Sequence, residues 1–359
     1  MATQSVAAAG PAQADGPTLD RMIGQMIMVG FRGDRPGDPR VATVAEQIAR
    51  SEVGGVLYLR HNLADRHAAV ALNRAFAGAW QGVPPLLAID QEGGRIARLG
   101  AAHDFPVFPS ARDMASRHRP NEAKRLFGQM AAGLREWGFN FNLAPVADLD
   151  INPESPVIGA LERSYSADPA VVDNYVAAFV LAHREHGVLS AIKHFPGHGS
   201  SATDSHEALP DVSASWTRGE LEPFGSAINC GLADAIMVGH LHVGGLQDGD
   251  GSEPASLSKR VVTDLLRKEL GHQGVVITDD LQMNAVTQNR SFGRAVVEAV
   301  LAGNDILLFA NFEDYDPRLP ERVRAILARR AEHDRALWEL IRASYQRILR
   351  LKHRLAAVG

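Results

Sequence analysis

The chain has 359 residues, with 37 lysines and arginines against 42 aspartates and glutamates, and a single cysteine. This length fits one α/β barrel with loop insertions, and the net charge of -5 gives no reason to expect a nucleic acid or an anionic membrane as a partner. One cysteine excludes a disulfide within the chain and a thiolate metal cluster.

Residues 1–17 are predicted to be a disordered leader, and residues 18–359 a single barrel domain. The start of the chain lacks the basic and apolar regions of a signal peptide. No stretch approaches the roughly 18 apolar residues that a membrane span requires. We therefore expect a cytoplasmic protein, with an exported form left open because the leader could be the remnant of a trimmed signal.

Short apolar runs alternate with helical patterns along the whole chain. Continuous apolar runs of this kind are typical of buried parallel strands. The predicted strands are Gln25–Phe31, Gly55–Leu59, Leu86–Asp90, Phe139–Asp148, Leu189–His194, Ala233–His240, Gly274–Asp279 and Asp305–Ala310.

The intervening helices have clear start and stop signals. One begins at Asp168-Pro169, an N-cap followed by proline, and stops at Gly187. The last part of the chain, Pro320 to Leu355, is predicted to form one or two closing helices. These alternations predict a single (β/α)8 TIM-type barrel with C-terminal closing helices. A doubly wound sheet is the alternative, but no glycine-rich dinucleotide fingerprint follows the first run.

Five of the predicted strands end in unusual polar residues. These ends are Asp90–Arg95, Ala144–Asp148, Lys193–Gly199, His240–His242 and Thr278–Asp280. The carboxyl ends of barrel strands converge on one face, where active sites lie, so we expect one common polar site. Carboxylates with positioned donors suit chemistry that develops positive charge on a sugar ring.

A metal site is the alternative interpretation of His194, His198, Asp204 and His206. The Pro-Gly and Gly-Ser-Ser segments between them indicate a loop and not a rigid helix with regularly spaced ligands. We therefore predict no metal and no cofactor.

The same polar segments carry a resemblance to a known family. Lys193–Gly199, followed four residues later by Asp204-Ser205-His206, resembles the signature of the NagZ-type β-N-acetylglucosaminidases of glycoside hydrolase family 3. Asp90–Arg95, Glu162–Tyr165 and Thr278–Met283 match that family in the same order. The motif that ends at His206 is highly specific, whereas Asp90–Arg95 alone would mark only the wider family.

The resemblance implies roles for individual residues. Asp279 is the implied nucleophile, and His206 is the implied proton donor and later base, oriented by Asp204. The residues implied to bind the N-acetylglucosamine ring are Asp90, Arg98, Arg163, Lys193 and His194. In the family's β-glucosidases the acid/base carboxylate comes from outside the barrel, and a histidine on a barrel loop removes the need for it.

The predicted function is that of a retaining, exo-acting β-N-acetylhexosaminidase. It would act on cell-wall (muropeptide) or chitin-derived saccharides as a monomer, with a saccharide as its partner. A phosphorylase or transglycosylase on the same site stays open, as does a Schiff-base lyase that uses Lys193. A sugar-binding barrel without catalysis is disfavoured, because binding alone requires neither Asp279 nor the His206–Asp204 pair.

Overall fold

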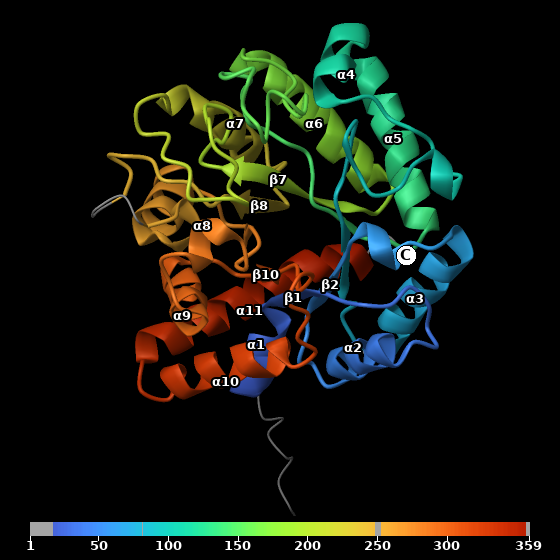
Figure 1. The fold of residues 1–359 in the computed structure, drawn as a ribbon, viewed down its shortest axis with the longest axis vertical. Coiled ribbons are helices and arrows are strands. Elements are labelled where there is room, and N and C mark those ends of the chain that lie inside the picture. Colours follow the sequence, from blue (N-terminus) through green and yellow to red (C-terminus); the bar gives the residue numbers. More distant parts are fainter. Residues whose placement is uncertain (1–16, 81, 248–252, 357–359) are drawn as a thin grey trace, which may run out of the picture.

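The computed structural model describes residues 17–80, 82–247 and 253–356. Their centre is a sheet of eight parallel strands in the order β10-β1-β2-β3-β6-β7-β8-β9 (Figure 1). The strands are β1 (Ile27–Gly30), β2 (Gly55–Tyr58), β3 (Leu86–Ile89), β6 (Phe141–Asn142), β7 (Leu189–Phe195), β8 (Ala235–Val238), β9 (Val275–Thr278) and β10 (Leu307–Phe309). Residues 1–16, on which most of the predicted leader falls, lie outside the described part.

The sheet closes on itself through contacts between β9 and β10. The amide of Thr278 donates to the carbonyl of Ile306 at 3.0 Å, and the amide of Leu281 donates to the carbonyl of Leu308 at 3.0 Å. The amide of Leu308 in turn donates to the hydroxyl of Thr278 at 3.0 Å. These bonds complete the ring, and the predicted (β/α)8 barrel is confirmed.

Each predicted apolar run overlaps one strand of the barrel, with β7 extending one residue further to Phe195, and every residue of these eight strands is buried. The largest difference is the fourth run, where only Phe141–Asn142 pairs as a strand. Its pairing with β3 stops there because the side-chain amide of Asn142 takes over. That amide accepts from the backbone N–H of Gln91 at 3.0 Å and donates to the carbonyl of Gln91 at 2.9 Å. Pro145, three residues on, has no N–H to donate.

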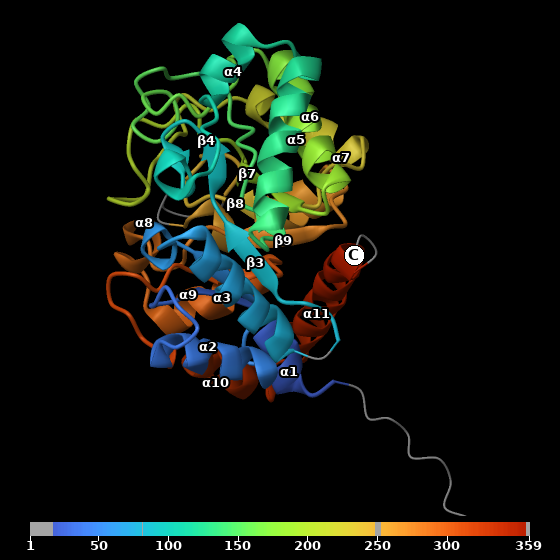
Figure 2. The ribbon, with the colours of Figure 1, turned by 90° about the vertical axis from the view of Figure 1, so that its right-hand side faces the viewer.

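Helices surround the strands (Figures 1 and 2). They are α1 (Leu19–Gln25), α2 (Pro39–Ala49), α3 (Arg66–Ala79), α4 (Ala111–Arg117), α5 (Pro120–Glu136), α6 (Pro169–Glu185), α7 (Glu222–Asn229), α8 (Asn284–Thr287), α9 (Phe292–Ala302), α10 (Leu319–Ala331) and α11 (Arg335–Ala356). Shorter 3₁₀ turns are η1 (Arg60–Asn62), η2 (Ala101–His103), η3 (Arg218–Leu221) and η4 (Ala255–Leu257), and η5 (Arg260–Glu269) is a π-helix. No helix in the described ranges is both long and apolar enough to cross a membrane.

Helix α6 shows how the local sequence sets these boundaries. The side chain of Asp168 accepts a hydrogen bond from the amide of Ala170, and Pro169 occupies the first turn, where no amide partner is needed. After the helix, Gly187 has a φ of +69°, a left-handed conformation that favours glycine. Both predicted ends of this helix are therefore confirmed.

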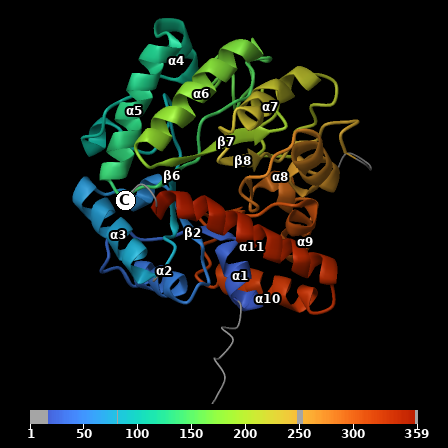
Figure 3. The same ribbon diagram turned by 180° about the vertical axis from the view of Figure 1, so that it is seen from behind.

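Helix α11 closes the end of the barrel at which the strands begin (Figure 3). The ammonium group of Lys352 donates to the side chain of Gln25 at 2.7 Å and to the carbonyl of Gly54 at 2.6 Å, just before β1 and β2. The hydroxyl of Ser344 donates to Asp305, just before β10, at 2.7 Å. The predicted closing helices are confirmed, and a site for a substrate must lie at the opposite end.

A small antiparallel hairpin extends beyond β3 at that opposite end. It consists of β4 (Gln91–Gly93) and β5 (Ile96–Ala97). The side-chain oxygen of Gln91 accepts from the amides of Arg98 and Leu99, both at 3.0 Å, and so holds the hairpin closed. The hairpin carries Glu92 and Arg98 toward the carboxyl ends of the strands.

Candidate active site

A pocket of about 300 Å³ opens at the carboxyl ends of the strands. Its wall combines charged side chains with apolar ones such as Met237 and Leu143. All eight site residues predicted from the sequence line this one pocket: Asp90, Arg98, Arg163, Lys193, His194, Asp204, His206 and Asp279. The predicted convergence of strand ends on a single site is therefore observed, while the role of each residue stays a prediction.

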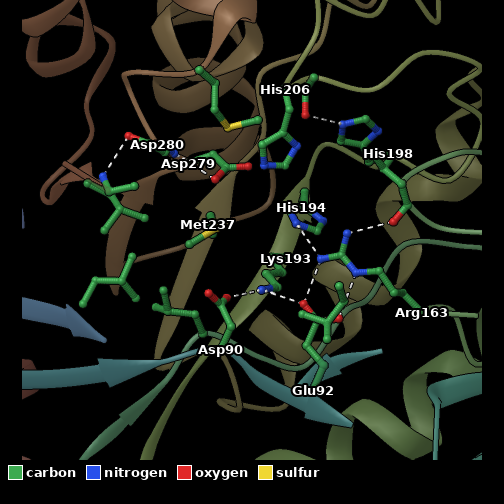
Figure 4. Close-up of a pocket in the computed structure, with 18 of the residues that line it drawn as sticks. Asp90, Glu92, Arg163, Lys193, His194, His198, His206, Met237, Asp279 and Asp280 are labelled. Atoms are coloured by element: carbon green, nitrogen blue, oxygen red, sulfur yellow. Dashed lines mark hydrogen bonds and ion pairs between the residues drawn. The ribbon is translucent and has the colours of Figure 1, made fainter. Parts of the chain in front are cut away.

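One side of the pocket is a buried network of ion pairs centred on Lys193 (Figure 4). Its ammonium group lies 2.8 Å from a carboxylate oxygen of Asp90 and 2.8 Å from one of Glu92. Arg98 donates to the second oxygen of Asp90 at 2.9 Å. Arg163 makes a bidentate contact with Glu92 at 2.9 and 2.8 Å. We call these five residues the charged side of the pocket.

The charged side stays ionised despite its burial. Burial favours the neutral forms, but the Lys193 and Arg98 charges outweigh it and hold the pKa of Asp90 well below its usual range. For Glu92, burial is likewise outweighed by Arg163 and Lys193, which lower its pKa to about 2. Burial would lower the pKa of Lys193, yet the two carboxylates raise it. A permanently protonated amine is not a nucleophile, so the Schiff-base lyase is disfavoured.

His194 is held from behind by Asp148, a buried residue to which the sequence assigned no role. The Nδ1 atom of His194 lies 2.7 Å from a carboxylate oxygen of Asp148, and the amides of His194 and His198 also donate to that carboxylate. The Nε2 atom of His194 faces Arg163 at 3.4 Å. These contacts fix the orientation of the ring and leave Nδ1 occupied.

Asp279 follows β9 directly and is partly buried in the wall of the pocket. One of its carboxylate oxygens accepts the amide of Asp280 at 2.8 Å. Burial favours the neutral acid, but His240, His194 and this amide outweigh burial and lower the pKa of Asp279. The carboxylate is therefore ionised at neutral pH, as a nucleophile requires.

Asp280, the next residue, braces the turn that carries Asp279. It accepts hydrogen bonds from the amides of Gln282 and Ala310, both at 3.0 Å. Burial, with a smaller contribution from the charge of Asp279, raises its pKa to about 6. The two adjacent carboxyl groups thus have opposite pKa shifts because their surroundings differ.

His206 and Asp204 lie on the loop after β7, across the pocket opening from the charged side. The Nδ1 atom of His206 is 2.8 Å from a carboxylate oxygen of Asp204, which also accepts the backbone amide of His206 at 2.8 Å. This pair leaves Nε2 of the imidazole free of the carboxylate. His206 points toward Asp279 (Figure 4), and its charge contributes to the lowered pKa of Asp279.

The four side chains considered as metal ligands do not converge on one point. Among the described residues, no group of three or more histidine, cysteine, aspartate or glutamate side chains is arranged to hold a metal ion.

Two residues of the site, Glu92 in the pocket wall and Asp148 behind His194, received no role from the sequence. Glu92 was noted only within the polar strand end Asp90–Arg95, yet it is paired with Arg163 and Lys193. Asp148 was noted only as a polar strand end. Their positions on strand ends three and four were the available signal, and the partners of each are set by the closing of the barrel.

A closed barrel with a carboxylate-rich pocket at the carboxyl ends of its strands is the arrangement typical of a barrel enzyme that acts on sugars. The sequence model described as the glycosyl hydrolase family 3 N terminal domain matches residues 18–351. The chain belongs to this family, and the resemblance found in its motifs is confirmed.

Individual relatives agree with this assignment. The chain is 33% identical to "Beta-hexosaminidase A" of Pseudoalteromonas piscicida, over 94% of this chain and 61% of the relative. It is 30% identical to a "Beta-hexosaminidase" of Bordetella avium, over 89% of this chain and 96% of the relative. A glycoside hydrolase family 3 β-N-acetylglucosaminidase structure from Paenibacillus sp. superposes with a TM-score of 0.85 at 35% identity, covering 95% of this chain and 63% of that one. The chain thus spans about three fifths of the Pseudoalteromonas relative and of the Paenibacillus structure.

Proposed function

We infer that the protein is a retaining, exo-acting β-N-acetylhexosaminidase that removes terminal β-N-acetylglucosamine from cell-wall or chitin-derived saccharides. The observation that carries this proposal is the facing of an ionised Asp279 and the His206–Asp204 pair across one pocket (Figure 4). A nucleophile and an acid on opposite sides of a glycosidic bond are the two groups that retention requires. The printed names of the relatives above support the same activity.

In the first step, a carboxylate oxygen of Asp279 forms a bond to the anomeric carbon while the bond from that carbon to the glycosidic oxygen breaks. The Nε2–H of His206 gives its proton to the leaving oxygen. Asp204, which accepts from Nδ1, stabilises the imidazolium before the transfer. In the second step, neutral His206 takes a proton from water, the water oxygen bonds to the anomeric carbon, and Asp279 leaves as a carboxylate.

The charged side would hold the sugar ring during both steps. Its five side chains already point into the pocket and are fixed by one another, so little reorganisation is needed when hydroxyls replace water. Asp90 can accept from ring hydroxyls, while Arg98, Arg163 and Lys193 can donate to them. His194, held by Asp148, adds a positioned ring edge beside them.

Hydrolysis of 4-nitrophenyl β-N-acetylglucosaminide tests the proposed activity, and proton NMR of the first product tests its stereochemistry. We expect turnover with the β-anomer formed first. No turnover would reject the enzyme, and the α-anomer first would reject the retaining mechanism. Product analysis with and without inorganic phosphate separates the hydrolase from a phosphorylase, since only the latter yields the sugar phosphate.

The source of the substrate is tested by comparing two disaccharides with the same non-reducing sugar. Chitobiose represents chitin fragments, and N-acetylglucosaminyl-anhydromuramic acid represents cell-wall fragments. We expect both to be cleaved, because the charged side of the pocket and His194 would bind the terminal N-acetylglucosamine that the two disaccharides share. Cleavage of larger chitin chains at internal bonds would contradict the exo-acting mode.

A further inference from the structure

The acid/base segment Asp204–His206 is attached to the protein mainly through its middle residue. The side chain of His206 is 72% exposed, so little packing holds it, and that of Asp204 is partly buried at 30% exposed. Ser205 between them is buried. Its hydroxyl lies 3.4 Å from Nε2 of His198, and its carbonyl accepts the amide of Ala285 at 3.3 Å.

A second attachment follows immediately. The side-chain amide of Gln288 donates to the carbonyl of Glu207 at 2.9 Å. Gln288 caps the end of α8, and Ala285 is inside it, so both contacts come from the same short helix. Both therefore connect the loop after β7 to an element that follows β9 in the chain.

Helix α8 is built onto the turn that carries Asp279. The amide of Met283, just before α8, donates to the carbonyl of Asp280 at 3.0 Å, and the amide of Gln282 donates to the side chain of Asp280 at 3.0 Å. The nucleophile turn and α8 form one hydrogen-bonded unit. A segment that contacts α8 is consequently attached to the same hydrogen-bonded unit that carries Asp279.

We propose that Gln288 is a positioning residue for the reaction: its bond to Glu207 docks the acid/base segment on α8 and so sets where His206 stands relative to Asp279. This inference rests on the proposed function. Gln288 does not line the pocket, so it acts through His206 and not by touching substrate. Because the side chain of His206 is mostly exposed, these contacts through the backbone are the main restraint on its position.

Gln288→Ala and Gln288→Glu test this proposal, since both remove the donor. We expect kcat for chitobiose to fall roughly 3- to 10-fold, as for the loss of one ordinary hydrogen bond, with KM little changed. The 4-nitrophenyl glycoside, whose leaving group needs little protonation, should lose much less. The matched control is Gln129→Ala, an exposed glutamine on α5, which should leave both substrates unaffected.

A double-mutant cycle separates positioning from a general structural effect. In a His206→Ala background, Gln288→Ala should cause no further loss, because the residue that it positions is gone. Equal losses with and without His206, or a loss of the same size for both leaving groups, would overturn the proposal.

Amide hydrogen exchange tests the contact between the acid/base segment and α8 even if the protein turns over no substrate. The amides of His206 and Glu207, which donate to Asp204, should exchange faster in Gln288→Ala than in the wild type. Unchanged exchange would overturn the docking. If the wild type hydrolysed neither substrate while the exchange rates changed as expected, the proposed function would fail and the docking of the segment would stand.

Discussion

The two sides of the pocket are built in opposite ways. On the charged side, Lys193 is 3% exposed and Glu92 7%, and each makes more than one ion pair. On the other side, His206 is 72% exposed, and the carboxylate that it contacts belongs to Asp204, two positions earlier in the chain. The contrast separates two tasks. Under the proposed mechanism, the rigid side would fix the terminal sugar ring, whereas the exposed acid would meet leaving groups of different shape.

Loss of the proposed nucleophile should have the largest effect on turnover and little effect on the fold. Asp279→Ala should reduce kcat by roughly 10⁴-fold, a loss typical of a residue that acts as part of a covalent mechanism. Its carboxylate is bonded to the adjacent amide of Asp280 and not to the packed barrel, so thermal unfolding should change little.

The assignment of Asp279 as the proposed nucleophile can be checked independently by covalent labelling. An activated 2-fluoro sugar should modify Asp279, which peptide mass analysis would locate. Modification of Asp280 or Glu92 instead would contradict the proposed mechanism.

Removal of the central cation should break the charged side as a structure. Lys193→Met leaves the buried carboxylates of Asp90 and Glu92 with one cation each, and we expect the free energy of unfolding to fall by about 3 kcal/mol. Urea unfolding measures this loss. A matched change on the other side, His206→Ala, should stay within about 0.5 kcal/mol of the wild type because the residue is exposed. Equal losses for the two variants would remove the distinction between the sides.

The acid/base side should be sensitive to the leaving group and not to stability. His206→Ala should reduce hydrolysis of chitobiose by roughly 10²- to 10³-fold and spare activated aryl glycosides comparatively well, because a poor leaving group depends most on protonation. Asp204→Ala should act in the same direction, and the double variant should be little worse than His206→Ala alone. Uniform losses for good and poor leaving groups would indicate that the pair only holds the loop.

The smallest expected effect concerns the loop that joins the two sides. Glu220 is fully buried beneath Gly197. Burial raises its pKa to about 7, with smaller opposing effects from Ser200 and from the amides of Gly199 and Thr217, while Asp148 adds to the rise.

The sign of the resulting pH dependence is fixed by this raised pKa. The contribution of Glu220 to stability is fully present below the ordinary carboxyl pKa near 4.5 and is lost as the pH rises through about 7. Glu220→Gln, which cannot ionise, should therefore lose less stability than the wild type between these pH values, by of the order of 2 kcal/mol. Denaturant unfolding at several pH values measures the difference. Parallel profiles for both proteins would contradict it.

The sequence predicted the fold, and which residues line the site, better than it predicted the contacts between those residues. Apolar runs such as Leu86–Asp90 and capping signals such as Asp168-Pro169 act over a few neighbouring residues, so they can be recognised without the fold. The strand-end rule then brings Asp90, Lys193 and Asp279 to one rim.

The partners across the pocket follow from a different kind of information. Asp148 meets His194 across 46 positions, and Arg163 meets Glu92 across 71. No local pattern states that these groups reach each other, because each contact exists only when neighbouring strands are in register. The same limit applies to Glu220, whose burial depends on how the loop after β7 folds back over it. The partners in such contacts can therefore be identified only from the three-dimensional structure.

The closure of the ring between β9 and β10 also has a consequence for the order of assembly. During synthesis the amino-terminal strands emerge first, yet β1 pairs with β10 on one side. The side chain of Gln25 likewise accepts a hydrogen bond from Lys352, which lies 327 positions later. Until that last part of the chain arrives, the sheet keeps two unpaired edges, which are prone to wrong pairing. Contacts so distant in sequence slow folding. The growing chain therefore exposes two unpaired strand edges until β10 and α11 have been made.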